Sequence, residues 1–299
     1  MISKNKNNID KSIPNWVVYN HALMPTSNPH EPADIDSLKN CMFRWNSLRS
    51  GVFFARYTSD WDSKECTNFW YVIKDSLFDI STIKAKRRYE IKKGLKKFVV
   101  KLVDLCECIN EVYHIQEKAF AVYPKKYRPK VTIDSVNTEM LNFKRKHSIE
   151  FAAYDKETGK MEGYAIIIMV KNVANFVALK VNPSVEKEGI NAAIVYNILW
   201  HLGMISNDKE IKRKCSYIND GARNIMHETN FQEYLEKYFG FRKAYCRLHL
   251  LYRFDIRIII KCLYVFRKQL IKLDGNRLIH KINSVMKMEE WNRESQYKI

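Results

Sequence analysis

The sequence predicts an α/β (α+β) protein in which strands and helices alternate along most of the chain. Three observations predict this class. Runs of aromatic and β-branched residues bounded by polar breakers are typical of strands. Segments with apolar residues at helical spacing lie between those runs. The 299 residues are 46% hydrophobic and contain only 9 Gly and 7 Pro, which is enough apolar material for a sizeable core and excludes collagen-like and low-complexity classes.

The first half of the chain carries its elements in a simple order. Residues 1–15 are rich in Asn and Lys, and we expect them to be disordered. A turn-rich stretch, 16–46, holds a short helix near 34–40. Two aromatic strands follow at 51–57 and 68–74. A basic helix then extends to about 93, with Ser81 as its N-cap and Gly94 as its stop. A strand at 98–103, a helix at 104–120 and a basic aromatic loop at 123–130 complete this half.

The second half predicts a hairpin followed by alternating elements. Its strands at 149–155 and 161–170 flank a turn that contains Gly. The next strand, 176–181, ends at Asn182-Pro183, and the loop 184–189 leads into an apolar helix from 190 to about 205. The remaining elements are a short strand at 215–218, a polar turn-like stretch at 219–224, a helix at 228–238 and a strand at 244–254.

The net charge of +18 is concentrated in two segments. Lys84–Lys101 holds nine basic residues and one acid, and Arg253–Met288 holds nine basic residues and two acids. Clustered like charges repel one another, so such a surface usually has an anionic partner. A cofactor phosphate, a tRNA, an anionic lipid and a nucleotide-sugar substrate all fit, and a solvated basic face is the alternative.

Cysteine spacing and hydropathy bear on the compartment. The seven Cys are scattered without a C-x2-C pair, which predicts reduced thiols and no metal site. No run of 18 uncharged apolar residues occurs, and the first thirty residues lack the apolar region of a secretory signal. The sequence therefore predicts a cytoplasmic protein, with peripheral contact to the inner face of an anionic membrane as an added possibility from its basic tail.

The order of elements from residue 69 to residue 254 resembles the Gcn5-related N-acetyltransferase (GNAT) fold, in its FemAB-like branch. The residues that carry the resemblance are the strand, loop and helix start ALKVNPSVEKEGINAA (178–193), and NFQEYLEKYFGF (230–241) with its Gly-Phe pair. Upstream, FWYVIKD (69–75) and KRRYEIKKGLK (86–96) are similar to the strand and basic helix of the FemAB-like branch. The resemblance implies a mixed, mostly antiparallel central sheet flanked by helices. It divides the chain into a disordered start (1–15), a strand-rich segment (16–80), a GNAT-like acyltransferase domain (81–254) and a basic amphipathic helical tail (255–299).

The resemblance also implies a binding site for acyl-CoA. A Gly-containing loop between a strand and a helix gathers backbone N–H groups that can hold a pyrophosphate. The candidate ligands at the corresponding positions are Lys180, Val181, Gly189, Ile190, Asn191 and Ala192, of which Gly189 matches the glycine of the family pattern. Glu186 stands where the family has a basic or amide residue, and Asn191 stands where it has a small one. A loop that only turns the chain into a buried helix is the alternative.

Catalytic candidates follow from the same comparison and from a polar cluster. Many GNAT enzymes have a Tyr four residues before the Gly of the Gly-Phe pair, and Glu236 occupies this position here, with Tyr234 and Tyr238 on another face of the helix. Seven hydrogen-bonding residues lie between a strand end and a helix start: Asn219, Asp220, Arg223, Asn224, His227, Glu228 and Asn230. We expect His227 or Glu228 to be the general base for an amine, and Asn219, Arg223 and Asn230 to contact an anion or substrate. Helix capping with the rest facing water is the alternative.

Two basic helices complete the prediction. The first contributes Arg87 and Arg88 as candidate anion ligands. The second, 254–273, alternates basic and apolar residues, and could lie on an anionic membrane or pack its apolar face on the domain.

The predicted function is acyl transfer, from acyl-CoA or aminoacyl-tRNA to an amine or hydroxyl of a small-molecule or cell-envelope precursor. A non-catalytic protein that binds an anionic polymer or membrane surface is the alternative. We expect no metal, and no motif predicts sequence-specific DNA binding.

Overall fold

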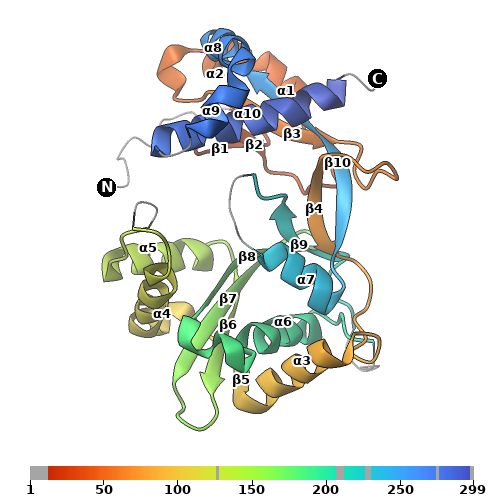
Figure 1. Ribbon diagram of the computed structural model, residues 1–299, viewed down its shortest axis with the longest axis vertical. Coiled ribbons are helices and arrows are strands. Elements are labelled where there is room, and N and C mark those ends of the chain that lie inside the picture. The colour runs from red at the N-terminus through yellow and green to blue at the C-terminus, as the bar shows by residue number, and fades with distance from the viewer. Residues whose placement is uncertain (1–12, 126–127, 207–211, 226–229, 274–275, 297–299) are drawn as a thin grey trace. The chain divides into compact units, whose positions relative to one another are not determined.

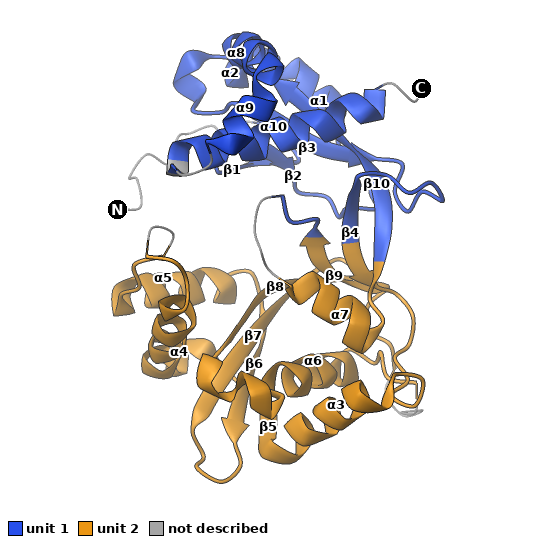
Figure 2. Ribbon diagram, viewed as in Figure 1, with its two compact units in different colours: residues 1–71, 222–229, 243–299 blue, residues 72–221, 230–242 orange. Residues whose placement is uncertain are grey.

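The computed structural model describes residues 13–125, 128–206, 212–225, 230–273 and 276–296. Contacts divide the chain into two compact units (Figure 2). Unit 1 contains residues 1–71, 222–229 and 243–299, and unit 2 contains residues 72–221 and 230–242. Three strands contain residues of both units: β4 (Phe69–Lys74), β9 (Tyr217–Ala222) and β10 (Arg242–Tyr252).

Unit 2 is built on a mostly antiparallel sheet with the order β9-β8-β7-β6-β5. The neighbouring strands pair antiparallel except β8 and β9, which are parallel. The strands are β5 (Phe98–Leu102), β6 (Ile149–Asp155), β7 (Met161–Val170), β8 (Val173–Val181) and β9. This arrangement confirms the predicted mixed, mostly antiparallel sheet flanked by helices.

Helices cover both faces of this sheet (Figure 1). On one face α4 (Ile109–Ala121) and α5 (Ile133–Lys144) pack over Tyr164 and Ile166. Gly163, the residue before Tyr164, points to the other face, where a Cβ atom would meet side chains of α6 (Ile190–His201). Helix α3 (Ala85–Lys97) packs on α6, and α7 (Phe231–Phe239) follows β9. The 3₁₀ turns are η3 (Leu105–Glu107) and η4 (Pro183–Glu188).

Unit 1 contains the strands β1 (Trp16–Tyr19), β2 (Ala22–Pro25), β3 (Phe54–Ser59) and most of β10, with helices on both faces of these strands. Strand β1 pairs antiparallel with β2, β2 pairs parallel with β3, and β3 pairs antiparallel with β10. Ala55 packs with residues of α1 (Ile35–Asn40) and α2 (Met42–Trp45), whereas its neighbour Phe54 shares a core with α10 (Arg277–Gln296). The remaining elements are η2 (Leu48–Ser50), α8 (Phe254–Val265) and α9 (Arg267–Lys272).

Several local predictions were wrong. Helix α3 begins after Lys84 rather than at Ser81, and it continues through Gly94 to Lys97. Gly94 lies inside the helix because α6 approaches so closely that a Cβ atom there would lie 2.2 Å from the carbonyl oxygen of Gly189. The stretch 219–222 belongs to β9 rather than to a turn. The hairpin β1–β2, helix α5 and the division of the C-terminal tail into three helices were not predicted.

Candidate active site in unit 2

The central feature of unit 2 is the separation of β8 from β9. These parallel strands pair only over Val173–Asn175 and Tyr217–Asn219 within the described chain, although β8 continues to Val181. On its other side, β8 has a bulge against β7, because Ile166 faces Ala178 and the next residue, Ile167, faces Phe176. The backbone of β8 beyond Asn175 is therefore left without β9 as a partner. Such an edge can pair with an extended ligand through its N–H and C=O groups.

Asp220 lies directly after the last paired residue of β9 and is half-buried. Burial raises the pKa of Asp220 to about 7, and a hydrogen bond from Gln232 on α7 partly offsets this effect. A carboxyl group with this pKa exists in both protonation states near neutral pH, as a general base requires. The same strand fixes the position: the Asn219 side chain donates to Asn175 Oδ1 at 2.9 Å and accepts from the Gly221 N–H. Asn219, predicted to bind substrate, thus fastens β9 to β8.

The predicted pyrophosphate loop forms the turn between β8 and α6. Gly189 has φ of +84°, which favours glycine, and it ends η4 with its N–H donated to Glu186 O. Helix α3 packs against this turn, since a Cβ atom on Gly189 would lie 2.8 Å from Glu90 O. Lys93 of α3 donates to Lys187 O and lies 3.5 Å from Glu188, so it offsets one acid of the loop.

The first residues of α6 include an unsatisfied polar atom. Ile190 and Ala192 are buried in the core, while the Asn191 side-chain oxygen is buried without a hydrogen-bond partner among the described residues. The first N–H groups of a helix have no intrahelical acceptors. The Ala193 N–H already donates to Gly189 O at 3.0 Å, so the backbone groups at the start of α6 that could meet an anion are those of residues 190–192.

Lys180 lies near the end of β8, on the face covered by α4 and α5. Its Nζ is 4.7 Å from the centre of the Phe120 ring, and burial lowers its pKa while Glu139 raises it. Glu139 accepts a hydrogen bond from Gln116, which also donates to the Tyr164 hydroxyl at 2.9 Å. Val181, the last residue of β8, is buried. Of these two predicted ligands, Lys180 is the one with a polar environment.

Helix α7 and the start of α3 hold the remaining predicted residues of unit 2. Glu236 is half-buried on α7, and Asn230 is exposed at its N-cap. Tyr234 and Tyr238 stack on each other at 4.5 Å. Arg87 donates to Lys237 O near the C-terminus of α7 and lies over the Tyr238 ring, and Arg88 donates to Ser81 O. Both arginines are therefore engaged with the protein.

Arg223 belongs to unit 1 and is also engaged there. Its guanidinium lies 4.2 Å from the Trp70 ring centre and 4.6 Å from that of Trp291, and it donates to Asn68 O at 2.6 Å. His227 and Glu228 lie outside the described residues, so their predicted role as base stays a prediction. Lys180, Asn219, Asp220 and the loop 186–192 thus all belong to unit 2, whereas Arg223 belongs to unit 1.

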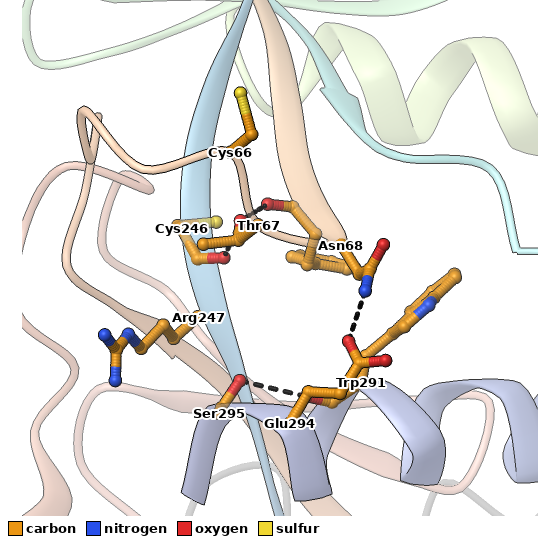
Figure 3. Close-up of a pocket in the computed structure, with 9 residues that line it drawn as sticks. Cys66, Thr67, Asn68, Cys246, Arg247, Trp291, Glu294 and Ser295 are labelled. Carbon is orange, nitrogen blue, oxygen red and sulfur yellow. Dashed lines mark hydrogen bonds between the residues drawn. The ribbon is translucent and has the colours of Figure 1, made fainter. Parts of the chain in front are cut away.

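Unit 1 has a small pocket of its own, with a volume of about 110 Å³ (Figure 3). The polar groups that line it bond to protein atoms: Thr67 Oγ1 donates to Cys246 O at 2.8 Å, Asn68 donates to Glu294, and Ser295 donates to Trp291 O. Burial raises the pKa of the Cys246 thiol to about 12, which disfavours a reactive thiolate. The buried thiol of Cys246 is therefore a poor nucleophile, and these three polar side chains are already engaged with the protein.

Asp220 is a candidate base to which the sequence prediction gives no role. It belongs to the polar cluster between residues 219 and 230, in a stretch predicted as a turn, which would expose its side chain to water. Residues 217–220 are two apolar residues followed by two polar ones, so they lack the alternation that is typical of a half-buried strand and give no local signal for β9.

The similarity of this chain to known proteins is limited to the fold. No known sequence family and no curated protein matches the chain. The solved structures similar to it include L-PGS from Bacillus licheniformis (12% identity, 84% of each chain covered, TM-score 0.46) and FemX (6% identity, 75% of this chain and 78% of that one, TM-score 0.46). The ribosomal-protein-S18-alanine N-acetyltransferase from Escherichia coli is also similar, at 17% identity over 34% of this chain and 57% of that one, with a TM-score of 0.27. Acetyltransferases and FemX are thus among the proteins to which this chain is structurally similar, at low identity.

Proposed function

We propose that this protein is an acyltransferase of the GNAT type, which moves an acyl group from acyl-CoA to an amine or hydroxyl of a small-molecule or cell-envelope precursor. The observation that carries the proposal is the parting of β8 from β9 at a bulge, with a buried carboxyl group on the residue after the last pair. The open edge of β8 would pair with the amide groups of pantetheine, and the α6 N-terminus would hold the phosphates.

The reaction needs one base and one departing thiolate. The amine nitrogen attacks the carbonyl carbon of the thioester, the C–N bond forms, the C–S bond breaks, and the thiolate leaves with a proton from the site or from water. Asp220 would take the proton from the attacking nitrogen. Glu236, His227 and Glu228 are the alternative bases, and the rate of Asp220→Asn distinguishes Asp220 from these three.

Calorimetric titration with acetyl-CoA at 0.15 M salt tests the donor. Salt must be fixed, because a chain with a net charge of +18 attracts any polyanion at low ionic strength. We expect saturable one-to-one binding. Val177, at the bulge, is 42% exposed, and Val177→Trp would place an indole on the open edge of β8 and weaken binding at least tenfold.

A matched control is available in unit 1. Val17 on β1 is 41% exposed, so Val17→Trp adds the same group to a strand position of similar exposure and should leave the affinity within twofold. Gly189 is unsuitable for such a test, because any side chain there would strain the turn and collide with α3. Wild-type protein that is folded and yet binds neither CoA nor acetyl-CoA at millimolar concentration rules out this donor.

Aminoacyl-tRNA is the second candidate donor, favoured by the basic residues of α3. Seven of its thirteen residues are Lys or Arg, and Lys92 and Lys96 are exposed. A polyanionic tRNA would be attracted to such a helix. Transfer from charged tRNA to an amine acceptor, abolished by Asp220→Asn, would identify this donor. Absence of transfer from both donors would leave the non-catalytic binding protein.

A further inference from the structure

We propose that unit 1 binds the surface of an anionic phospholipid bilayer through an apolar and basic surface formed by α2, η2 and α8. The apolar members of this surface are Phe43, Leu48, Phe254, Ile258 and Val265, and the basic members are Arg44, Arg49, Arg257 and Lys261. The inference is independent of the acyltransferase proposal.

The apolar members are exposed to an unusual degree. Phe43 and Leu48 are each 74% exposed, and Phe254 and Val265 are each 70% exposed. Single exposed apolar residues are normal on a protein surface, whereas a group of large ones marks an interaction site. This group includes two phenylalanines, which favour the boundary between headgroups and acyl chains.

The parts of the surface are neighbours within unit 1. The backbone N–H of Phe254 donates to the Asn46 side chain, which directly follows α2, at 2.8 Å. Phe43 precedes Asn46 by three residues and so lies on the same side of that turn. Figure 1 shows α8 next to α2 in unit 1.

Helix α8 presents apolar residues on two faces. Ile260 is buried toward the core. On the outer side, Phe254, Ile258 and Val265 follow one another at intervals of four and seven residues, which places them in one stripe along the helix. Arg257 and Lys261 border this stripe and are exposed. The inner face of α8 thus packs on the core of unit 1, while the apolar stripe on its outer side is exposed.

The positive charges around this surface favour an anionic partner. Residues 254–273 contain five basic residues and one acid, Asp255, whose carboxylate forms an ion pair with Arg253 at 2.6 Å. Arg44 and Arg49 add two further positive charges from α2 and η2. A net positive rim around exposed apolar side chains complements an anionic lipid surface, which offers phosphates at the rim and acyl chains at the centre.

Sedimentation of the full-length chain with vesicles tests the proposal. Vesicles of phosphatidylcholine with 30% phosphatidylglycerol should bind the protein at 0.15 M salt, and pure phosphatidylcholine vesicles should bind it at least tenfold more weakly. Phe254→Ser with Ile258→Ser should weaken binding to the anionic vesicles at least tenfold, and Arg257→Glu with Lys261→Glu should do the same. Each altered side chain is exposed, so circular dichroism should show an unchanged fold.

A charge-matched control separates this surface from general attraction. Lys92→Glu with Lys96→Glu changes the net charge equally on α3 of unit 2, and it should alter lipid binding less than twofold. Equal losses in both charge variants, or unchanged binding of the double serine variant, would overturn the proposal in favour of diffuse electrostatic binding.

A direct readout of insertion completes the test. Fluorescence of Phe254→Trp should be quenched by brominated acyl chains beyond the quenching of the wild-type tryptophans. Concentration-dependent dimerisation that disappears in the double serine variant, without any lipid quenching, would assign the surface to a second copy of the chain and overturn the lipid proposal.

Discussion

The raised pKa of Asp220 lowers the free energy of unfolding near neutral pH, and the same raised pKa suits a general base. Its carboxyl group is buried at the point where β8 and β9 separate, and burial raises its pKa from 3.8 to about 7. Between these two values the folded chain holds a proton that the unfolded chain has released. The free energy of unfolding therefore falls as pH rises through this window, and the loss persists above it.

Replacing the carboxyl group should separate the two effects. Asp220→Asn removes the buried charge, so its melting temperature should match that of the wild type at pH 4 and exceed it by several degrees at pH 8. A shift of about 3 pKa units corresponds to at most about 4 kcal/mol. Calorimetric scans across this pH range provide the measurement.

The same variant should lose activity. The wild-type rate should rise with pH and level off above about 7, because only the carboxylate accepts a proton. Asp220→Asn should lower the rate at pH 8 at least a hundredfold while donor affinity stays within twofold. If Asp220→Asn keeps the wild-type rate and melting temperature at pH 8, Asp220 is not the general base, and Glu236 or His227 becomes the candidate.

At the scale of elements, the close packing of α3 on α6 constrains the turn at Gly189. Gly94 lies in the middle of α3, where glycine normally lowers helix stability by about 1 kcal/mol relative to alanine. Here its missing Cβ atom lets the helix approach the Gly189 carbonyl and the N-terminus of α6.

Gly94→Ala should therefore destabilise the chain despite its better helix propensity. A methyl group 2.2 Å from the Gly189 oxygen forces the helices apart, and overpacking of this kind costs about 1–3 kcal/mol. Urea unfolding measures the difference. Lys92→Ala, at an exposed position of the same helix, should change stability by less than about 0.5 kcal/mol. A more stable Gly94→Ala protein would show that α3 does not approach α6 so closely.

This contact explains what sequence reasoning can and cannot recover from an element. The order β5 to β8 was predictable because continuous apolar runs and a Gly-containing turn are local signals. Gly94 was interpreted as a helix stop, because a close approach between two helices has no local signal. Helix α5 did carry one, since Thr132 and Ser135 cap each other at its start, but their spacing lacks the usual Glu or Gln.

Short elements were missed for a related reason. Strands β1 and β2 have four residues each and are joined by Asn20 and His21, both with positive φ. A turn of this kind usually contains glycine, so the hairpin has a weak sequence signal. Pairing of β2 with β3 and packing against Trp45 stabilise it, and these contacts are distant in sequence.

At the scale of the whole molecule, the two basic segments and the two proposed sites lie in different units. Unit 2 holds the open edge of β8, Asp220 and the basic helix α3, and unit 1 holds the apolar and basic surface of α2, η2 and α8. The sequence predicts both basic segments and offers membrane contact for the second, but it leaves docking of that helix on the domain as an equal alternative. That choice depends on exposure and on burial, which arise only from the fold. Among the described residues, no helix is long and apolar enough to span a membrane.

The two proposed functions should therefore be separable by mutation. Phe254→Ser with Ile258→Ser should lose binding to anionic vesicles and keep the affinity for acetyl-CoA within twofold, because these side chains belong to unit 1 and the donor site belongs to unit 2. Asp220→Asn should show the reverse, with normal vesicle binding and a lost transfer rate on a water-soluble acceptor. Vesicle sedimentation and transfer rates, both measured on the double serine variant and on Asp220→Asn, test this prediction. Loss of both activities in either folded variant would contradict this separation.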